Sequence, residues 1–566
     1  MPSIPSPLVL FAATGVALSA CSSDETSVSP APVPGHDAGT DVQEDQQAEA
    51  QPGEDADARG DAPVDAPAGV FQAIAARAEQ ERAQLGAPGV AIAILQNGQV
   101  TWSGGFGSKD PNGDDPVHDT TLFRIGSVQK MLTATALLRR VEAGQVDLQQ
   151  PITTYLPTLS FALDPSWAPS ITVWNMLTHT SGIVDYLEVD SALRDDSALS
   201  EYLLGTFAQQ GYLMVSPGRF YNYTNPGYMY AGLVTETVAG KPYRIDLKDS
   251  VLAPLDMNRT FLLPADVLAD GDYALGKTVD WNTGAPLLAH PDTYDNAWAR
   301  PAGYAWSSVL DLAKFVTFLA KGNPGVLSDT SRNAMSGEQV DTEEALDLAH
   351  YGFGVASARG FFIGSSFYET RLLSHPGAIP GFAADLYYLP ACDLGFITLA
   401  NTDGAYFTST LVQVITTLCD LPAPSTNPPD LSVDPSSFDD YVGDYQDDFN
   451  AGQVTLSRVG DELHISIPLA DAASIPYGKV LTPVLPRNFL LDIQGTQLLL
   501  TVIVDDQGKG EYLRTRAFVA ARQPSGSAPT AHAPTPASLH RAVSRAPAEP
   551  AFSRLLRPNT FASARR

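Results

Sequence analysis

Two β-rich parts of the sequence stand far apart, and a largely helical middle separates them. The first part comprises Gly89–Leu95 and Val100–Phe106, which flank the dipeptide Asn97-Gly98. Asn-Gly between such runs is typical of a tight β-hairpin. The second part comprises residues 383–389 and 394–400, which read as another strand pair. We therefore expect an α+β fold, in which one antiparallel sheet is built from both ends of the domain and flanked by helices, with a helical subdomain.

The helical middle begins at a serine that follows a glycine. From Ser127 onwards apolar residues recur at helical spacing, and Gly144 stands where such a helix would end. Lys130 lies three residues after Ser127, so both side chains share one helix face. A serine hydroxyl needs a neighbouring base to act as a nucleophile, and a lysine whose pKa is lowered by burial can be that base. Taken alone, the pattern also fits an ordinary helix start capped by Ser127.

A second polar motif follows the turn residues Pro217-Gly218 and precedes a helical pattern over residues 226–239, which Gly240 is expected to end. It contains Tyr223 and Asn225, which are two positions apart and can project from one loop edge. A tyrosine with a lowered pKa can relay protons, and an asparagine can hold a lysine or a substrate amide. The alternatives are a core aromatic residue and a helix cap.

A third motif, His375-Pro376-Gly377-Ala378, stands at the start of a predicted strand. Gly377 would let a substrate backbone approach closely. The Ala378 N–H could then complete an oxyanion hole with the Ser127 N–H. The alternative for His375 is a surface position at the end of a strand.

The three motifs occur in the order Ser127-x-x-Lys130, Tyr223-x-Asn225 and His375-x-Gly377, and together they resemble those of the serine β-lactamase and penicillin-binding protein family. The most similar branch contains class C β-lactamases and D-alanyl-D-alanine carboxypeptidases. Residues 177–182, 301–308 and 400–401 also match that family, and the resemblance extends over roughly residues 70–421. In the family the segment around His179 is structural.

The resemblance implies an exported serine hydrolase that forms an acyl-enzyme. Ser127 would be the nucleophile, with Lys130 and the Tyr223 phenolate sharing the roles of general base and general acid, and the substrate-binding residues would be Asn225, His375, Gly377 and Ala378. The foremost expectation is a D-alanyl-D-alanine carboxypeptidase-like peptidase acting on peptidoglycan stem peptides. Histidine in the third motif occurs in carboxypeptidase-like and esterase-like members, whereas lysine is usual in class C β-lactamases.

Two alternatives stay open. An esterase or a β-lactamase would use the same scaffold, and the substrate would then be an ester or a β-lactam instead of a small peptide. A protein of a different class, a non-catalytic penicillin-binding or wall-binding sensor lipoprotein, would keep the fold without turnover.

Other classes find little support in the sequence. The nine histidines show no paired metal-ligand spacing, so we predict neither a metal site nor a cofactor. No G-x-S-x-G elbow occurs, which counts against an α/β-hydrolase. The formal net charge of -30 argues against a nucleic-acid partner.

The N-terminal region reads as a secretion signal followed by a tether. An apolar run ends in Leu18-Ser19-Ala20-Cys21, which resembles the lipobox of bacterial lipoproteins, although no Lys or Arg precedes the run. This predicts a signal peptide over residues 1–21 and a lipid anchor at Cys21 that holds the protein to the bacterial membrane, facing the periplasm or the cell exterior. Residues 22–68 are acidic and rich in Ala and Pro, and they are expected to be disordered.

The remaining boundaries follow from composition. A hydrolase domain is expected over residues 69–421, a Pro-rich linker comes next, and short alternating runs over 432–521 predict a small all-β, barrel-like domain. Residues 522–566 carry many arginines among Ala, Pro and Ser and are expected to be a disordered basic tail. Cys392 and Cys419 could pair in an oxidising compartment or be two separate buried thiols.

Overall fold

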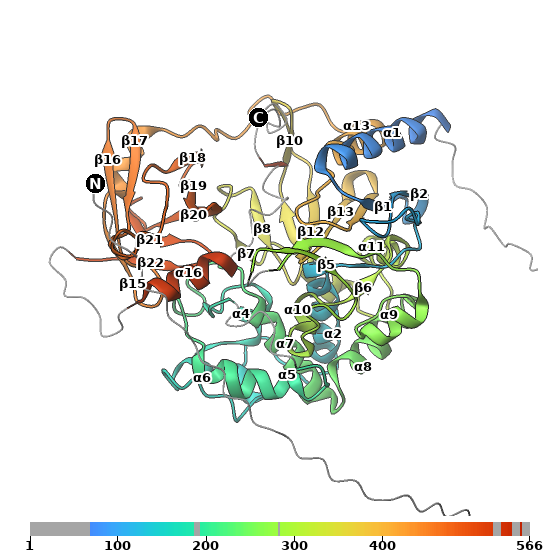
Figure 1. Cartoon of the computed structure of the whole chain (residues 1–566), viewed down its shortest axis with the longest axis horizontal. Helices are drawn as coiled ribbons and strands as arrows, with labels where there is room; N and C mark the ends of the chain where they lie inside the picture. The colour runs from blue at the N-terminus through green and yellow to red at the C-terminus, as the bar shows by residue number, and fades with distance from the viewer. Residues whose placement is uncertain (1–67, 186–192, 281–282, 525–533, 546–554, 557–566) are drawn as a thin grey trace, which may run out of the picture. The chain divides into compact units, whose positions relative to one another are not determined.

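The computed structural model describes residues 68–185, 193–280, 283–524, 534–545 and 555–556 (Figure 1). All of them belong to one compact unit. The predicted signal peptide with Cys21, and the acidic segment as far as residue 67, lie outside the described residues. None of the described helices combines the length and the apolar character needed to cross a membrane.

The core of the first domain is an eight-stranded antiparallel sheet. From one edge to the other, its strands are β2 (Gln99–Gly107), β1 (Gly89–Gln96), β14 (Leu394–Ala400), β13 (Phe382–Leu389), β12 (Leu372–Ile379), β9 (Ala356–Ala358), β8 (Ala349–Tyr351) and β7 (Val340–Asp341). In register, Val90 pairs with Ala400 and Gln96 with Leu394, so strands from the two ends of the domain lie side by side in the sheet. The expectation of one sheet built from both ends is confirmed.

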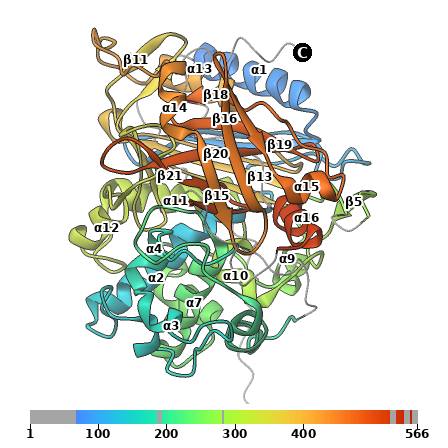
Figure 2. The same ribbon diagram turned by 90° about the vertical axis from the view of Figure 1, so that its left-hand side faces the viewer.

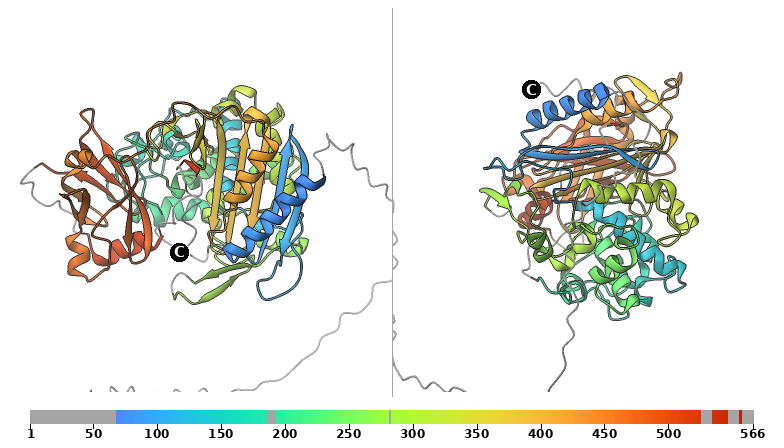
Figure 3. Two further views of the ribbon diagram at one scale, coloured as in Figure 1. Left: turned by 90° about the horizontal axis from the view of Figure 1, so that it is seen from above. Right: turned by 90° about the vertical axis from the view of Figure 1, so that its right-hand side faces the viewer.

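Helices cover both faces of this sheet. The helices α1 (Ala68–Leu85) and α13 (Thr408–Leu418) pack together on one face, and α11 (Val309–Lys321) packs on β14 and β1 from the other, as the right-hand view of Figure 3 shows. Strand β1 therefore buries alternate residues in two different cores, Ala91 and Ala93 in one and Val90 and Ile92 in the other. This explains why β1 is apolar throughout and does not alternate with polar residues.

The helical subdomain lies on the α11 side of the sheet and is organised around α2 (Gln129–Glu142) and α7 (Asn225–Ala239), which pack against each other. The left-handed Gly240 ends α7, as its position in the sequence predicted. The other helices are α3 (Trp167–Ser170), α4 (Val173–Leu177), α5 (Ala198–Glu201), α6 (Ala208–Gln210), α8 (Tyr243–Leu247), α9 (Pro264–Asp270), α10 (Arg300–Gly303) and α12 (Asp329–Met335). Three short strand pairs complete the domain: β3 (Phe123–Arg124) with β6 (Trp306–Ser307), β4 (Gly276–Val279) with β5 (Pro286–Ala289), and β10 (Phe361–Ile363) with β11 (Ser366–Tyr368).

The C-terminal domain, called the β domain below, is a second antiparallel sheet. Its strands follow the order β17 (Glu462–Ser466), β16 (Gly452–Val459), β15 (Gly443–Asp447), β22 (Val519–Arg522), β21 (Gly510–Arg514), β20 (Thr496–Val504), β19 (Asn488–Ile493) and β18 (Thr482–Leu485) (Figure 2). The sheet curls until its ends approach, because His464 on β17 bridges Val480 just before β18. Two short helices, α14 (Phe438–Tyr441) and α15 (Pro468–Ala472), accompany the sheet. The prediction of a small barrel-like all-β domain is confirmed.

Part of the C-terminal tail departs from the expected disorder. Helix α16 (Pro536–Arg545) is formed within it, and Leu539 and Val543 are buried in the core of the β domain. These two apolar residues are four positions apart, so one helix face carries both and gains stability by burying them. The remainder of the tail lies largely outside the described residues.

The two cysteines that the sequence left open form a disulfide. Cys392 follows β13 and Cys419 ends α13, so the bond ties the turn between β13 and β14 to the helix that covers the sheet.

Candidate active site

Ser127 lies on a single 3-10 turn, Gly126–Val128, that leads directly into α2. Gly126 has a φ of 50°, and a Cβ there would come within 2.6 Å of the Ala378 nitrogen on β12. Only glycine combines this backbone conformation with so close an approach. The turn therefore holds Ser127 against β12. Neither helical segment there has a side-chain cap, so Ser127 is not a capping serine.

The Nζ atom of Lys130 is the meeting point of three polar atoms. It lies 2.9 Å from Ser127 Oγ, 2.7 Å from Asn225 Oδ1 and 2.7 Å from the carbonyl oxygen of Ala302. An amide oxygen and a carbonyl oxygen can only accept hydrogen bonds, whereas a hydroxyl can also donate. A neutral amine has two N–H groups for the two acceptors and one lone pair left for the Ser127 hydroxyl. The geometry thus matches a neutral lysine poised to take the proton of Ser127.

Electrostatics favour the same state. Lys130 is fully buried, and burial lowers its pKa well below the ordinary value. The negative charge of Asp185 acts in the opposite direction, and the positive charge of Arg516 adds to the lowering. This is the direction that the sequence analysis required of a lysine base.

Tyr223 differs from the expectation of a tyrosine with a lowered pKa. Burial raises its pKa, while the charge of Arg516 and a hydrogen bond with Ser127 oppose this rise. A buried phenolate is costly because it loses its hydration. Tyr223 therefore rests as a neutral phenol next to Ser127, suited to donating a proton.

Asn225 stands at the start of α7 and links the lysine to a carboxylate. Its Oδ1 accepts from Lys130, and its Nδ2 donates to Asp185 Oδ1 at 3.0 Å. The backbone N–H of Asn225 donates to the same oxygen at 2.9 Å. Asp185 thereby fixes the orientation of the amide, so that its oxygen faces Lys130. Thr224, not Asn225, holds the N-cap position of α7.

His375 is buried on β12, with 2% of its surface exposed, so it is not a surface histidine. Its Nδ1 lies 2.7 Å from the carbonyl oxygen of Pro376, which requires the proton on Nδ1. Its Nε2 then accepts from the Tyr351 hydroxyl at 3.0 Å. Burial, reinforced by Lys130, lowers the pKa of His375 to about 3, so the ring is neutral near pH 7. Both nitrogens are engaged within the protein, and the residue brings no charge to the site.

Gly377 lies against the segment of chain that leads into Ser127. A Cβ there would come within 2.1 Å of the Ile125 carbonyl oxygen, so the glycine lets the chain before Ser127 approach β12. The approach brings the backbone nitrogen of Ala378 beside Gly126. Ala378 is exposed and Ser127 is partly exposed, whereas Lys130 is buried. A substrate carbonyl can therefore reach Ser127 from the Ala378 side.

His179 lies beneath the site in a cluster of aromatic rings. Its ring centroid is 4.1 Å from that of Tyr223 and 4.8 Å from that of Tyr351. Its Nδ1 accepts from the Thr224 backbone N–H at 3.2 Å, and burial lowers its pKa well below the ordinary value. A neutral, buried ring packed against Tyr223 supports that tyrosine, in keeping with the structural role expected for this segment.

Several residues of the site carried no recognisable signal in the sequence. Asp185 and Arg516 are 331 positions apart, yet they form an ion pair at the site. Tyr351 and the Ala302 carbonyl were also missed as individual groups, although residues 301–308 had matched the family. No local spacing could have indicated these contacts, because each depends on how distant segments pack.

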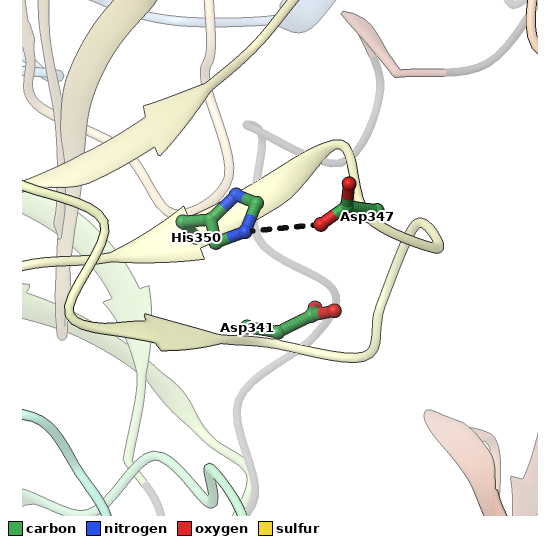
Figure 4. Close-up of side chains that lie close together, drawn as sticks. All are labelled: Asp341, Asp347 and His350. Atoms are coloured by element: carbon green, nitrogen blue, oxygen red, sulfur yellow. Dashed lines mark ion pairs between the residues drawn. The ribbon is translucent and has the colours of Figure 1, made fainter.

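One cluster among the described residues has the composition of a metal site. The cluster consists of Asp341 on β7, Asp347 in the turn that follows and His350 on β8. Their ligand atoms lie within 4.8 Å of one another (Figure 4). The Nε2 of His350 faces Asp347 at 3.4 Å. Arg359, however, already forms an ion pair with Asp347 and another with Glu338. We interpret the cluster as an ion-paired brace of this sheet edge.

Comparison with known proteins agrees with the fold and the motifs. The model of the family described as Beta-lactamase matches residues 74–412, which is more than half of the chain. The chain therefore belongs to the Beta-lactamase family, whose fold is that of a serine hydrolase.

Individual relatives are more distant. Protein flp of Staphylococcus aureus (strain COL) is 25% identical over 320 residues, which cover 56% of this chain and 60% of that protein. The chain thus spans about three fifths of the length of the curated relatives it matches. Among solved structures, SurE with D-Leu shares 20% identity with a TM-score of 0.58, and covers 81% of this chain and 100% of its own. The D-amino acid amidase from Ochrobactrum anthropi SV3 shares 24% identity with a TM-score of 0.51, over 62% of this chain and 98% of its own.

Proposed function

We propose that this protein is an exported serine hydrolase that forms an acyl-enzyme at Ser127. The observation that carries the proposal is the set of three contacts at Lys130 Nζ, which leaves one lone pair for the Ser127 hydroxyl. A nucleophile within hydrogen-bond reach of a base, whose orientation is fixed by a third group, is the usual arrangement for covalent catalysis.

The reaction would begin with the transfer of the Ser127 proton to Lys130 as Oγ attacks a substrate carbonyl. The negative charge that develops on the carbonyl oxygen would be met by the backbone N–H groups of Ser127 and Ala378. Tyr223, a neutral phenol next to Ser127, would protonate the leaving group and recover a proton from Lys130. Water would then hydrolyse the ester at Ser127 by the same steps in reverse.

For the substrate, we propose a peptide or amide that contains a D-amino acid residue, with a D-alanyl-D-alanine carboxypeptidase-like activity on peptidoglycan stem peptides as the first candidate. The support is the resemblance of the three motifs, together with structural neighbours described as a D-amino acid amidase and as SurE with D-Leu. The neutral His375 stands where class C β-lactamases usually carry a lysine, which places β-lactam hydrolysis lower.

An esterase is the second candidate, and one observation favours it. The buried His375 is uncharged and Pro376 has no side-chain donor, so this part of β12 offers no cation to a substrate carboxylate. A substrate without a free carboxylate, such as an ester, would not need a cation at this position.

Export and a lipid anchor at Cys21 are part of the same proposal. The support is the lipobox-like sequence before Cys21 and the disulfide between Cys392 and Cys419, since disulfides persist mainly in oxidising compartments. In the native bacterium, the wild-type protein should fractionate with membranes and the Cys21→Ala variant should not. Equal membrane association of both would contradict the anchor.

The hydrolase itself is tested by covalent labelling. The wild type should form one adduct, detected by mass, with a fluorophosphonate probe or a fluorescent penicillin, and Ser127→Ala should form none. Hydrolysis of a D-Ala-D-Ala peptide, a short-chain ester and a chromogenic cephalosporin would then rank the substrates. Turnover retained in Ser127→Ala would refute the mechanism, and an adduct without turnover of any substrate would favour a non-catalytic sensor.

A further inference from the structure

A tight turn of the β domain reaches the groups that surround Lys130. The turn joins β21 to β22 and carries Arg516. Thr515 stabilises it, because its Oγ1 accepts from the backbone N–H groups of Ala517 and Phe518 at 3.1 and 2.9 Å. Arg516 is therefore presented from a rigid turn.

Arg516 makes two contacts with the candidate site. Its Nη2 donates to Asp185 Oδ2, and its Cζ lies 4.7 Å from the centroid of the Tyr223 ring. The side chains of Arg516 and Asp185 are 21% and 9% exposed, so the ion pair is largely shielded from water. Shielded pairs are strongly oriented, and removing one partner leaves the other charge uncompensated.

The pair is the outer end of a continuous chain of polar contacts. One oxygen of Asp185 binds Arg516, and the other accepts from the side chain and backbone of Asn225. The oxygen of the Asn225 amide accepts from Lys130, which contacts Ser127. The β domain is thus connected to the nucleophile through four successive contacts.

Further contacts hold the β domain in this position. Arg514 is buried and donates to the backbone carbonyls of Tyr221 and Thr342. Asn450 and Tyr212 are joined by a hydrogen bond, and the Tyr212 ring stacks on Phe449 with centroids 3.9 Å apart. These contacts fix the place from which Arg516 extends.

We propose that Arg516 is a positioning residue for acyl transfer at Ser127, which acts through Asp185 and Asn225, so that the β domain completes the active site. The inference rests on the proposed function of Ser127. Asp185 Oδ1 accepts from both N–H groups of Asn225, and Arg516 binds the other oxygen of the same carboxyl group beside the buried lysine.

The two charges of the Arg516–Asp185 pair have opposite effects on the pKa values of Lys130 and Tyr223. Arg516 lowers the pKa of both residues, and Asp185 raises it. Among the described residues, the rings of five other titratable side chains contact this cluster: His179, His375, Tyr221, Tyr228 and Tyr351. Burial lowers the pKa values of the two histidines and raises those of the three tyrosines. All five are therefore neutral near pH 7, and the pair supplies the charges that reach Lys130.

The test is the pH dependence of kcat/KM for an activated ester in Arg516→Met, Arg516→Lys, Asp185→Asn and the double variant Asp185→Asn/Arg516→Met. The acidic limb of this profile reports the base of the free enzyme. Its midpoint should move to higher pH by about one unit in Arg516→Met and to lower pH in Asp185→Asn. It should return near the wild-type value in the double variant and in Arg516→Lys. At pH 7, Arg516→Met should lose about 10- to 100-fold in kcat/KM.

Arg219→Met is the matched control. Arg219 pairs with Glu511 of the β domain and is 44% exposed, but it makes no contact with the site. Its profile should stay within about half a pH unit of the wild type. Losses of activity in Arg516→Met and Asp185→Asn without opposite shifts of the midpoint would overturn the proposal and leave a structural brace. A wild type that neither labels at Ser127 nor turns over the ester would instead refute the proposed function.

Discussion

The helical region and the β domain each bring a basic side chain to the ring of Tyr223. Lys130 Nζ, from α2, lies 5.0 Å from the ring centroid, and the guanidinium carbon of Arg516 lies 4.7 Å from it. Lys130 contacts only neutral groups and is fully buried, whereas Arg516 has a carboxylate partner. Burial can lower the pKa of a lysine until the amine is neutral, whereas an arginine stays charged. One region therefore supplies a base to the site, and the other supplies a fixed charge.

The largest effect is expected from replacing the base by a fixed charge. Lys130→Arg should lower kcat/KM by about 10³-fold, because a guanidinium cannot take the Ser127 proton. Lys130→Ala should lose a similar amount, and labelling by a fluorophosphonate measures both. If Lys130→Arg kept a tenth of the wild-type rate, the positive charge and not the lone pair would be what Lys130 contributes.

Removing the Tyr223 hydroxyl should have the next largest effect. Tyr223→Phe should lose about 10²-fold in kcat for amides and alkyl esters, which need a proton on the leaving group. An activated aryl ester, whose leaving group needs none, should lose much less. Tyr221→Phe is the matched control, since Tyr221 is a buried neighbour outside the contacts of Ser127. Equal losses on both substrate types would contradict a donor role.

Arg514→Met separates docking of the β domain from its charge. The substitution leaves the carbonyls of Tyr221 and Thr342 without their donor and should cost about 1–3 kcal/mol of unfolding free energy. The midpoint of the pH profile should not move, because Arg514 is not among the charges that act on Lys130. Thermal melting and the pH profile measure the two effects. A shifted midpoint would mean that loosened docking alone accounts for the behaviour of Arg516 variants.

The smallest effect on activity is expected for His375→Asn, whose consequence is for stability at low pH. Burial lowers the pKa of His375 from 6.5 to about 3, so the unfolded chain takes up a proton between these values that the folded protein does not. The folded protein therefore keeps its full stability with respect to this residue above pH 6.5, and loses stability as the pH falls from 6.5 towards 3. The variant should therefore lose stability less steeply, by up to about 1.4 kcal/mol per pH unit, in urea unfolding at pH 4 to 7. If the unfolding free energy of variant and wild type fell with pH at the same slope, His375 would be charged in the folded protein. His464→Asn, on β17, is the control.

Features that depend on neighbouring residues could be predicted from the sequence. The hairpin of β1 and β2 followed from Asn97-Gly98, and the strands β13 and β14 from two neighbouring β-rich runs. The end of α7 followed from Gly240. Turn chemistry and hydrophobic periodicity depend on a few neighbouring residues, so they can be recognised in the sequence without knowledge of the tertiary structure.

Features that depend on packing could not be predicted. The pKa of Tyr223 is raised and not lowered because burial outweighs the charges around it. Gly377 accommodates the carbonyl oxygen of Ile125, a contact that only the approach of two distant segments reveals. Asp185 and Arg516 carry no motif. Helix α16 is different: Leu539 and Val543 did signal it, but the composition of the whole tail obscured them.

The pairing of β1 with β14 has a consequence for how the chain acquires its structure. Residues about 300 positions apart must pair before β1 can join β14 in the sheet, and β13, β12 and the Ser127 turn follow β14 in the same sheet. Contacts of such long sequence separation make folding slow, because a large loop must be closed before they contribute. The surroundings of Ser127 can therefore form only after the ribosome has synthesised the chain as far as Ala400, the end of β14.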